Sequence, residues 1–127
     1  MAESGGCFVA TASAAGLLTQ LGSPVYSATK HAAVAFAEWL AVTYGDLGLQ
    51  VCCLAPMGVR TAMLEPGAVQ VADARLGLAA ISSAGAVLSA KDVARYLIDA
   101  INSTRFFVLP HQEVATMVRR KAEDPDA

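Results

Sequence analysis

The chain has 127 residues, of which 55% are hydrophobic, and its mean hydropathy is +0.48. Its net charge of −2 excludes the strongly basic surface by which proteins bind nucleic acids; its cation cluster, Arg119-Arg120-Lys121, is interpreted as the solvated end of a helix. The length suits one small domain, and the apolar content is typical of a parallel sheet covered by helices on both faces, so an α/β fold is expected.

The first predicted element is a short buried strand at Phe8–Thr11, which leads to Ser13. Small residues follow the serine, Ala14-Ala15-Gly16, and we expect them to let a ligand approach the backbone. A hydroxyl at the end of a strand, beside small residues, is therefore a candidate ligand contact.

A helix is predicted next, from about Val25 to Tyr44. Ser23 and Pro24 favour a helix start, with serine as N-cap and proline at the first position. Tyr26 and Lys30 are four residues apart and therefore share one face of this helix. An ammonium near a phenol favours the phenolate and so makes a tyrosine a better general acid or base. Taken alone, the spacing is common on solvated amphipathic helices.

Further elements follow in an alternating order. Residues 45–48 end the helix and lead into a second strand, Gln50–Leu54. Ser89–Asp92 is a capping box that opens another helix, and Phe106–Leu109 is a third strand. Strands connected through helices favour parallel pairing. Residues 122–127 are predicted to form a disordered tail.

The order of strand, serine, loop and Tyr/Lys helix resembles the active-site half of the short-chain dehydrogenase/reductase family. A third segment supports the resemblance, because Pro56 and Thr61 follow the second strand at the family's spacing, although Met57 stands where the family usually has glycine. The resemblance implies a Rossmann-like doubly wound parallel sheet. Only its C-terminal portion is expected here, with three strands and flanking helices.

The resemblance also implies roles for individual residues. Hydride would pass between NAD or NADP and a secondary alcohol or ketone, while Tyr26 exchanges the hydroxyl proton. Lys30 would assist the tyrosine and bind the cofactor ribose, and Ser13 would hold the substrate oxygen. The remaining expected contacts are Pro56, Gly58, Val59 and Thr61 for the nicotinamide, and Ala15 and Met57, with Ser13, for the substrate.

No glycine-rich turn for a pyrophosphate occurs in the sequence, neither G-x-x-x-G-x-G nor G-x-G-x-x-G. We therefore expect residues 1–121 to be the C-terminal half of the family's domain. Two hypotheses follow: the catalytic half of an oxidoreductase, or a truncated, inactive fragment or association module. Residues 62–88 correspond to a lid that would favour an apolar substrate, or else to an ordinary amphipathic helix and loop.

Other side chains are interpreted as structural. Phe36 and Trp39 are expected to pack, and the resemblance implies a homo-oligomer through the Tyr/Lys helix. His31 is interpreted as a surface or interface residue and His111 as a loop residue, so neither predicts a metal site. Ser13 and His31 do not form a hydrolase pair, since no G-x-S-x-G surrounds the serine.

The cysteines and the N-terminus indicate a reduced, cytoplasmic location. Cys7, Cys52 and Cys53 fall in predicted strands, so buried thiols are favoured over a disulfide or a metal role. Residues 4–29 lack charge, but polar residues, glycine and proline interrupt them, unlike a membrane-spanning helix. Met1–Ser4 lacks the basic start of a signal peptide.

Overall fold

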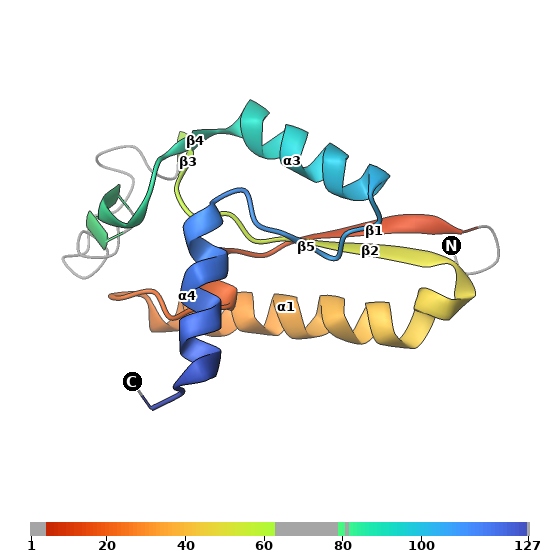
Figure 1. Cartoon of the computed structure of the whole chain (residues 1–127), viewed down its shortest axis with the longest axis horizontal. Coiled ribbons are helices and arrows are strands. Elements are labelled where there is room, and N and C mark those ends of the chain that lie inside the picture. Colours follow the sequence, from red (N-terminus) through yellow and green to blue (C-terminus); the bar gives the residue numbers. More distant parts are fainter. Residues whose placement is uncertain (1–4, 63–78, 81, 127) are drawn as a thin grey trace.

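A three-stranded parallel sheet forms the centre of the molecule (Figure 1). The computed structural model describes residues 5–62, 79–80 and 82–126. The strands are β1 (Gly6–Thr11), β2 (Leu49–Leu54) and β5 (Phe107–Val108), in the order β1-β2-β5. Both pairings are parallel, as the alternation of strands and helices predicts.

Neighbouring side chains of β2 point to opposite faces of the sheet, because side chains alternate along a strand. Val9 lies opposite Cys52 and Ala10 opposite Cys53. Cys53 packs in the cluster with Val34 of the first helix, whereas Cys52 packs in a separate cluster on the other face. Cys52 and Cys53 are buried free thiols, as predicted, whereas Cys7 is only half-buried.

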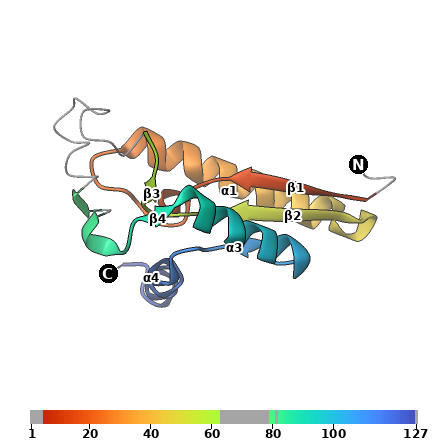
Figure 2. The same ribbon diagram turned by 90° about the horizontal axis from the view of Figure 1, so that it is seen from above.

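Two helices cover these two faces (Figures 1 and 2). Helix α1 (Pro24–Tyr44) lies on one face, where Val34 and Ala37 are buried against β2. Helix α3 (Ala90–Asn102) lies on the other, where Val93 and Ala100 are buried. Each helix thus buries one apolar stripe against the sheet.

The helix starts follow the sequence signals in different ways. Ser89 caps α3, since its Oγ accepts a hydrogen bond from the Asp92 amide at 3.1 Å. Pro24 is the first residue of α1, as predicted, but Ser23 makes no side-chain capping bond there. The fixed φ of proline is therefore the local signal that starts α1.

Several elements are additional to those predicted. Two short strands, β3 (Val59–Arg60) and β4 (Leu88–Ser89), pair in parallel as a second sheet. Short 3₁₀ turns, η1 (Ala14–Gly16) and η2 (Gly45–Leu47), flank α1. Helix α4 (Gln112–Glu123), by contrast, agrees with the interpretation of Arg119-Arg120-Lys121 as a solvated helix end, because these exposed residues lie near its end. It crosses one end of the sheet and continues two residues into the predicted tail (Figure 1). Most of the predicted lid, residues 63–78 and 81, lies outside the described residues.

Within the part of the chain described by the structure, no helix combines the length and the apolar character needed to span a membrane.

Candidate active site

Ser13 lies between the end of β1 and the start of η1, where it is the N-cap residue. Its backbone is extended, with φ of −169°, and its Oγ accepts a hydrogen bond from the Ala15 amide at 3.2 Å. The residue is 9% exposed. Because this bond uses only a lone pair of the hydroxyl, the proton on Oγ can still be donated to a ligand.

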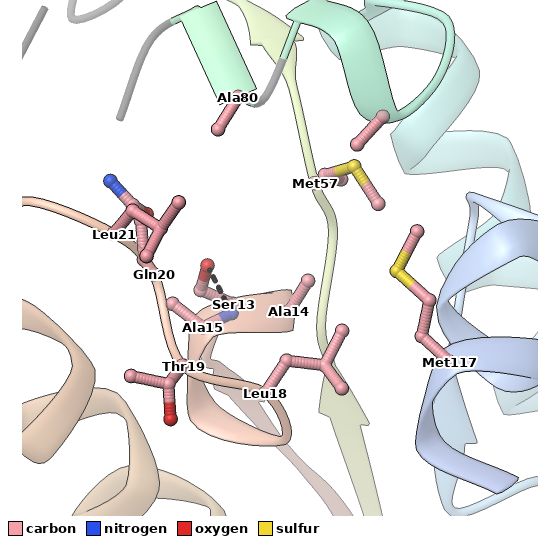
Figure 3. A pocket seen from close by; sticks show the side chains of 11 residues that line it. Ser13, Ala14, Ala15, Leu18, Thr19, Gln20, Leu21, Met57, Ala80 and Met117 are labelled. Carbon is pink, nitrogen blue, oxygen red and sulfur yellow. Dashed lines mark hydrogen bonds between the residues drawn. The ribbon is translucent and has the colours of Figure 1, made fainter. Parts of the chain in front are cut away.

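An open cavity of about 210 Å³ adjoins this serine (Figure 3). Ser13 and Ala15 contribute one wall, and Met57 faces Met117 of α4 across the opening, as Figure 3 shows. The other lining residues are Ala14, Leu18, Thr19, Gln20, Leu21, Ala80 and Ala84. Since most of these side chains are apolar, the cavity suits an apolar group with one polar atom directed at the serine.

The loop after β2 runs beside the serine. The Ala14 amide donates to the Pro56 carbonyl at 2.8 Å, and the Ala12 amide donates to Leu54 at the same distance. These bonds extend the pairing of the first two strands beyond their ends, and thereby hold Met57 close to Ser13. The predicted substrate residues Ser13, Ala15 and Met57 accordingly line one cavity.

The Tyr/Lys pair lies at the start of α1. Lys30 Nζ donates a hydrogen bond to the Thr11 carbonyl at 3.1 Å, and it lies 5.6 Å from the centroid of the Tyr26 ring. This distance is within the range of a cation–π contact. Tyr26 and Lys30 are half-buried, and neither is among the residues that line the cavity.

Gly16 has a different role from the one predicted. A Cβ on Gly16 would lie 2.5 Å from the Lys30 carbonyl oxygen and 2.8 Å from its carbon. This glycine therefore lets η1 pack against the backbone of α1. Of the three small residues, Ala14 and Ala15 line the cavity, whereas Gly16 is not among its lining residues.

His111, interpreted from its sequence context as a loop residue, is buried beside the residues of this site. It is 3% exposed at the N-cap of α4, and its ring contacts the backbone of Met57, Gly58 and Ala86. The signal that could have found it is its position just after β5, because side chains beyond the carboxyl ends of parallel strands meet at one edge of the sheet.

The residues expected to hold the nicotinamide lie along one loop. Gly58 is buried, and its carbonyl accepts the Leu88 amide at 3.0 Å. Val59 begins β3, whereas Thr61 is exposed. Lys30 and Tyr26, the other two residues expected to contact the cofactor, are half-buried on α1. The sequence has no glycine-rich turn for the pyrophosphate.

Burial also shifts the ionisation of two thiols. It raises the pKa of Cys53 to about 11, with a smaller contribution from the Glu38 carboxylate. Burial likewise raises the pKa of Cys52, and the neighbouring Cys7 adds to this shift. Such thiols stay protonated and unreactive near neutral pH. In the described ranges, no group of three or more His, Cys, Asp or Glu residues could hold a metal ion.

Residues 1–70 match the sequence model of the short chain dehydrogenase family. Among curated proteins, the chain is 41% identical over 58 residues to (21S)-21-acetoxyl-apo-melianone synthase of Melia azedarach, covering 46% of this chain and 21% of that protein. It is also 41% identical over 62 residues to an uncharacterized NAD-dependent oxidoreductase of Mycobacterium tuberculosis, covering 49% of this chain and 22% of that protein.

Solved structures extend the similarity over nearly the whole chain. A short-chain dehydrogenase/reductase of Burkholderia phymatum, in complex with NAD, is 28% identical with a TM-score of 0.73 over 98% of this chain and 49% of that one. A short-chain dehydrogenase of Sphingobium yanoikuyae, in complex with NADPH, is 19% identical with a TM-score of 0.69, over 94% and 42%, and shows the fold alone. The chain thus spans about half the length of these structures.

Proposed function

Because the chain belongs to the short-chain dehydrogenase/reductase family, we propose that it is the catalytic half of an NAD(P)-dependent oxidoreductase acting on a secondary alcohol or ketone. In this proposal residues 1–121 are the C-terminal half of the family's domain. Ser13, Tyr26 and Lys30 carry the catalytic roles.

The hydrogen bond from Lys30 to Thr11 is the single observation that carries the proposal. It fastens the Tyr/Lys helix to the end of the strand that leads into Ser13. The close packing of Gly16 on Lys30 supports the same placement from the other side of the serine. Both contacts join the start of α1, which carries Tyr26 and Lys30, to the segment around Ser13, and so support a shared role for the three residues.

Each side chain has a distinct part in the proposed reaction. The Ser13 hydroxyl donates to the substrate oxygen and stabilises the negative charge that builds up there during ketone reduction. Tyr26 gives its phenolic proton to that oxygen, or takes it in the reverse direction. Lys30, whose Nζ lies 5.6 Å from the centroid of the Tyr26 ring, is proposed to assist the tyrosine in this proton transfer.

The cofactor would supply or accept the hydride. Pro56, Gly58, Val59 and Thr61 are proposed to orient its nicotinamide, and Lys30 its ribose. A partner segment must supply the pyrophosphate site, since the sequence has no turn suited to it. Either NAD or NADP fits this arrangement, because the two differ at the adenosine end.

The cavity supports a small apolar substrate. Alanine, leucine and methionine side chains make up most of its lining, and Ser13 provides a hydroxyl at its edge. Such a lining favours binding of an alkyl or ring substituent, while the carbonyl oxygen of the substrate would accept a hydrogen bond from Ser13.

Exposed apolar surface on α1 favours a second function, association with another chain. Phe36 and Trp39 are each 52% exposed and stack with centroids 6.0 Å apart, and Val42 is 86% exposed. Among the described strands, β1 pairs only with β2, so its other edge is open. We propose that α1 mediates a homo-oligomer, and that an inactive association module is the alternative to the catalytic half.

Calorimetric titration of the folded 127-residue chain with NAD and NADP tests whether this half recognises the cofactor without a partner segment. We expect no useful affinity, because the pyrophosphate site is missing. Binding at micromolar concentration would contradict this expectation and show that the chain recognises the cofactor by itself. The Ser13 cavity is tested separately by titration with cyclohexanone, using a Ser13→Ala variant as the control for the hydroxyl.

A further inference from the structure

We propose that His111 is the positioning residue of the Ser13 cavity, because one buried imidazole ties together three of the cavity's walls. This inference rests on the proposed function insofar as the cavity is taken to be the substrate site. His111 need not touch substrate or cofactor to act in this way, since it works through the backbone of the residues that do.

The hydrogen bonds of His111 assign each ring nitrogen a role. Nδ1 accepts from the Met57 amide at 3.1 Å. Nε2 faces the carbonyl oxygens of Gly58 at 3.1 Å and Ala86 at 3.0 Å. Since an amide can only donate and a carbonyl can only accept, the proton lies on Nε2 and is shared between the two carbonyls.

The hydrogen bonds of His111 and its place at the start of α4 connect it to three different segments that line the Ser13 cavity. Met57 lines the cavity with its side chain, and the bond to its amide holds the backbone from which that side chain projects. Ala86 follows the segment that contributes Ala80 and Ala84 to the opposite side. His111 itself is the N-cap of α4, whose Met117 faces Met57 across the opening (Figure 3).

The arrangement has little redundancy at Met57. The Gly58 carbonyl also accepts a hydrogen bond from the Leu88 amide, so β3 and β4 remain connected when the histidine is removed. The Met57 amide, by contrast, has His111 as its acceptor. Removal of the imidazole should therefore release Met57 first, while the two short strands stay paired.

Three substitutions separate the two functions of the ring. His111→Asn places an amide oxygen near the position of Nδ1 and keeps an acceptor for Met57. His111→Gln places an NH₂ group near the position of Nε2 and keeps a donor for the carbonyls. His111→Ala removes both. His31→Ala is the matched control, because within the described residues the His31 ring bonds to the Ser27 carbonyl of its own helix.

The first readout is hydrogen exchange of the Met57 amide in the 127-residue chain. We expect exchange at least about tenfold faster in His111→Ala and His111→Gln, with protection largely restored in His111→Asn. The second readout is the affinity for cyclohexanone, followed by the methyl resonances of Met57 and Met117 in chain labelled with ¹³C-methyl methionine. It should fall about tenfold in His111→Ala and recover in His111→Asn, whereas His31→Ala should match the unaltered chain.

Wild-type exchange at Met57 together with wild-type cyclohexanone affinity in a folded His111→Ala variant would overturn the inference. If that variant does not fold, equal exchange at Met57 in the Asn and Gln variants would overturn it instead. Failure of the proposed function looks different. In that case cyclohexanone would shift neither methionine methyl of the unaltered chain, while exchange at Met57 would still report whether His111 holds the loop.

Discussion

Gly16 lies so close to Lys30 that a single added methyl group would meet the backbone of the neighbouring helix. The Cβ of an alanine at this position would be 2.5 Å from the Lys30 carbonyl oxygen. Lys30 in turn donates its side-chain hydrogen bond to Thr11, at the end of β1. The turn that follows Ser13 and the helix that carries Tyr26 are thus joined by both a backbone contact and a side-chain contact.

Gly16→Ala is predicted to destabilise the fold by about 1–3 kcal/mol, the usual cost of overpacking, because backbone atoms cannot move aside as a flexible side chain can. Urea unfolding measures the change. Gly45→Ala is the control, since among the described residues no heavy atom beyond the adjoining chain lies within 4 Å of a Cβ at Gly45, and its φ is −58°. That variant should be neutral or more stable by up to about 1 kcal/mol. Equal stability of the two variants would contradict the contact.

Met57→Gly is predicted to widen the Ser13 cavity and change its preference for ligands. Loss of the thioether removes one apolar wall, so affinity for cyclohexanone should fall about tenfold while a bulkier ketone such as 2-adamantanone loses less or gains. Titration with both ketones measures the change in preference. Met117→Leu, which nearly preserves volume, should leave the preference in place. An unchanged ratio of the two affinities in Met57→Gly would rule out a role for this side chain in selection.

Cys53 is predicted to make the fold less stable at alkaline pH. Burial, and secondarily Glu38, raises the pKa of this thiol from 9.0 to about 11. Above pH 9 the unfolded chain releases the proton while the folded chain retains it, so the free energy of unfolding falls until the pH approaches 11. The loss from this group should be roughly 1–3 kcal/mol.

Urea unfolding at about pH 8 and about pH 10.5 measures this dependence, and Cys53→Ala should reduce it. Cys52, whose pKa burial also raises, leaves part of the dependence in that variant. An identical loss of stability with pH in the variant and the unaltered chain would contradict the assignment to Cys53.

Trp39→Glu is predicted to weaken self-association. Trp39 stacks on Phe36 at 6.0 Å on the exposed side of α1, and a carboxylate there would have to be desolvated in an interface. Sedimentation velocity should show the dissociation constant of the oligomer rising at least about tenfold. Ile98→Glu is the comparison, because Ile98 is 56% exposed on α3, across the sheet. If both variants associate alike, α1 is not the interface.

The sequence predicts the main sheet well because its signals are local. Apolar runs gave β1 and β2, and the Ser89–Asp92 pattern located the start of α3, with the predicted capping bond to the Asp92 amide. The two-residue strands β3 and β4 carry no periodicity, and their pairing depends on contacts between segments that are distant in the sequence. Such elements follow from tertiary packing rather than from propensity.

The candidate site was predictable only in part, for the same reason. Spacing on one helix places Tyr26 beside Lys30, and chain order places Ser13 at a strand end. The burial of His111 among the backbone of Met57, Gly58 and Ala86 arises where three separate segments converge. The closeness of Gly16 to Lys30 likewise requires the angle between turn and helix, which no local pattern contains.

The most direct test of the central claim is hydride transfer in a hybrid protein. This chain would replace the corresponding half of the NAD-bound Burkholderia phymatum protein, of which it covers 49%. Circular dichroism and NAD titration would first establish that the hybrid is folded and binds the cofactor.

NADH formation from cyclohexanol is then measured for the hybrid and for its Tyr26→Phe variant. We predict turnover that falls at least about 100-fold in the variant, since general acid–base catalysis contributes that much or more. A hybrid that binds NAD but shows no turnover, or turns over equally well without the Tyr26 hydroxyl, would contradict the claim.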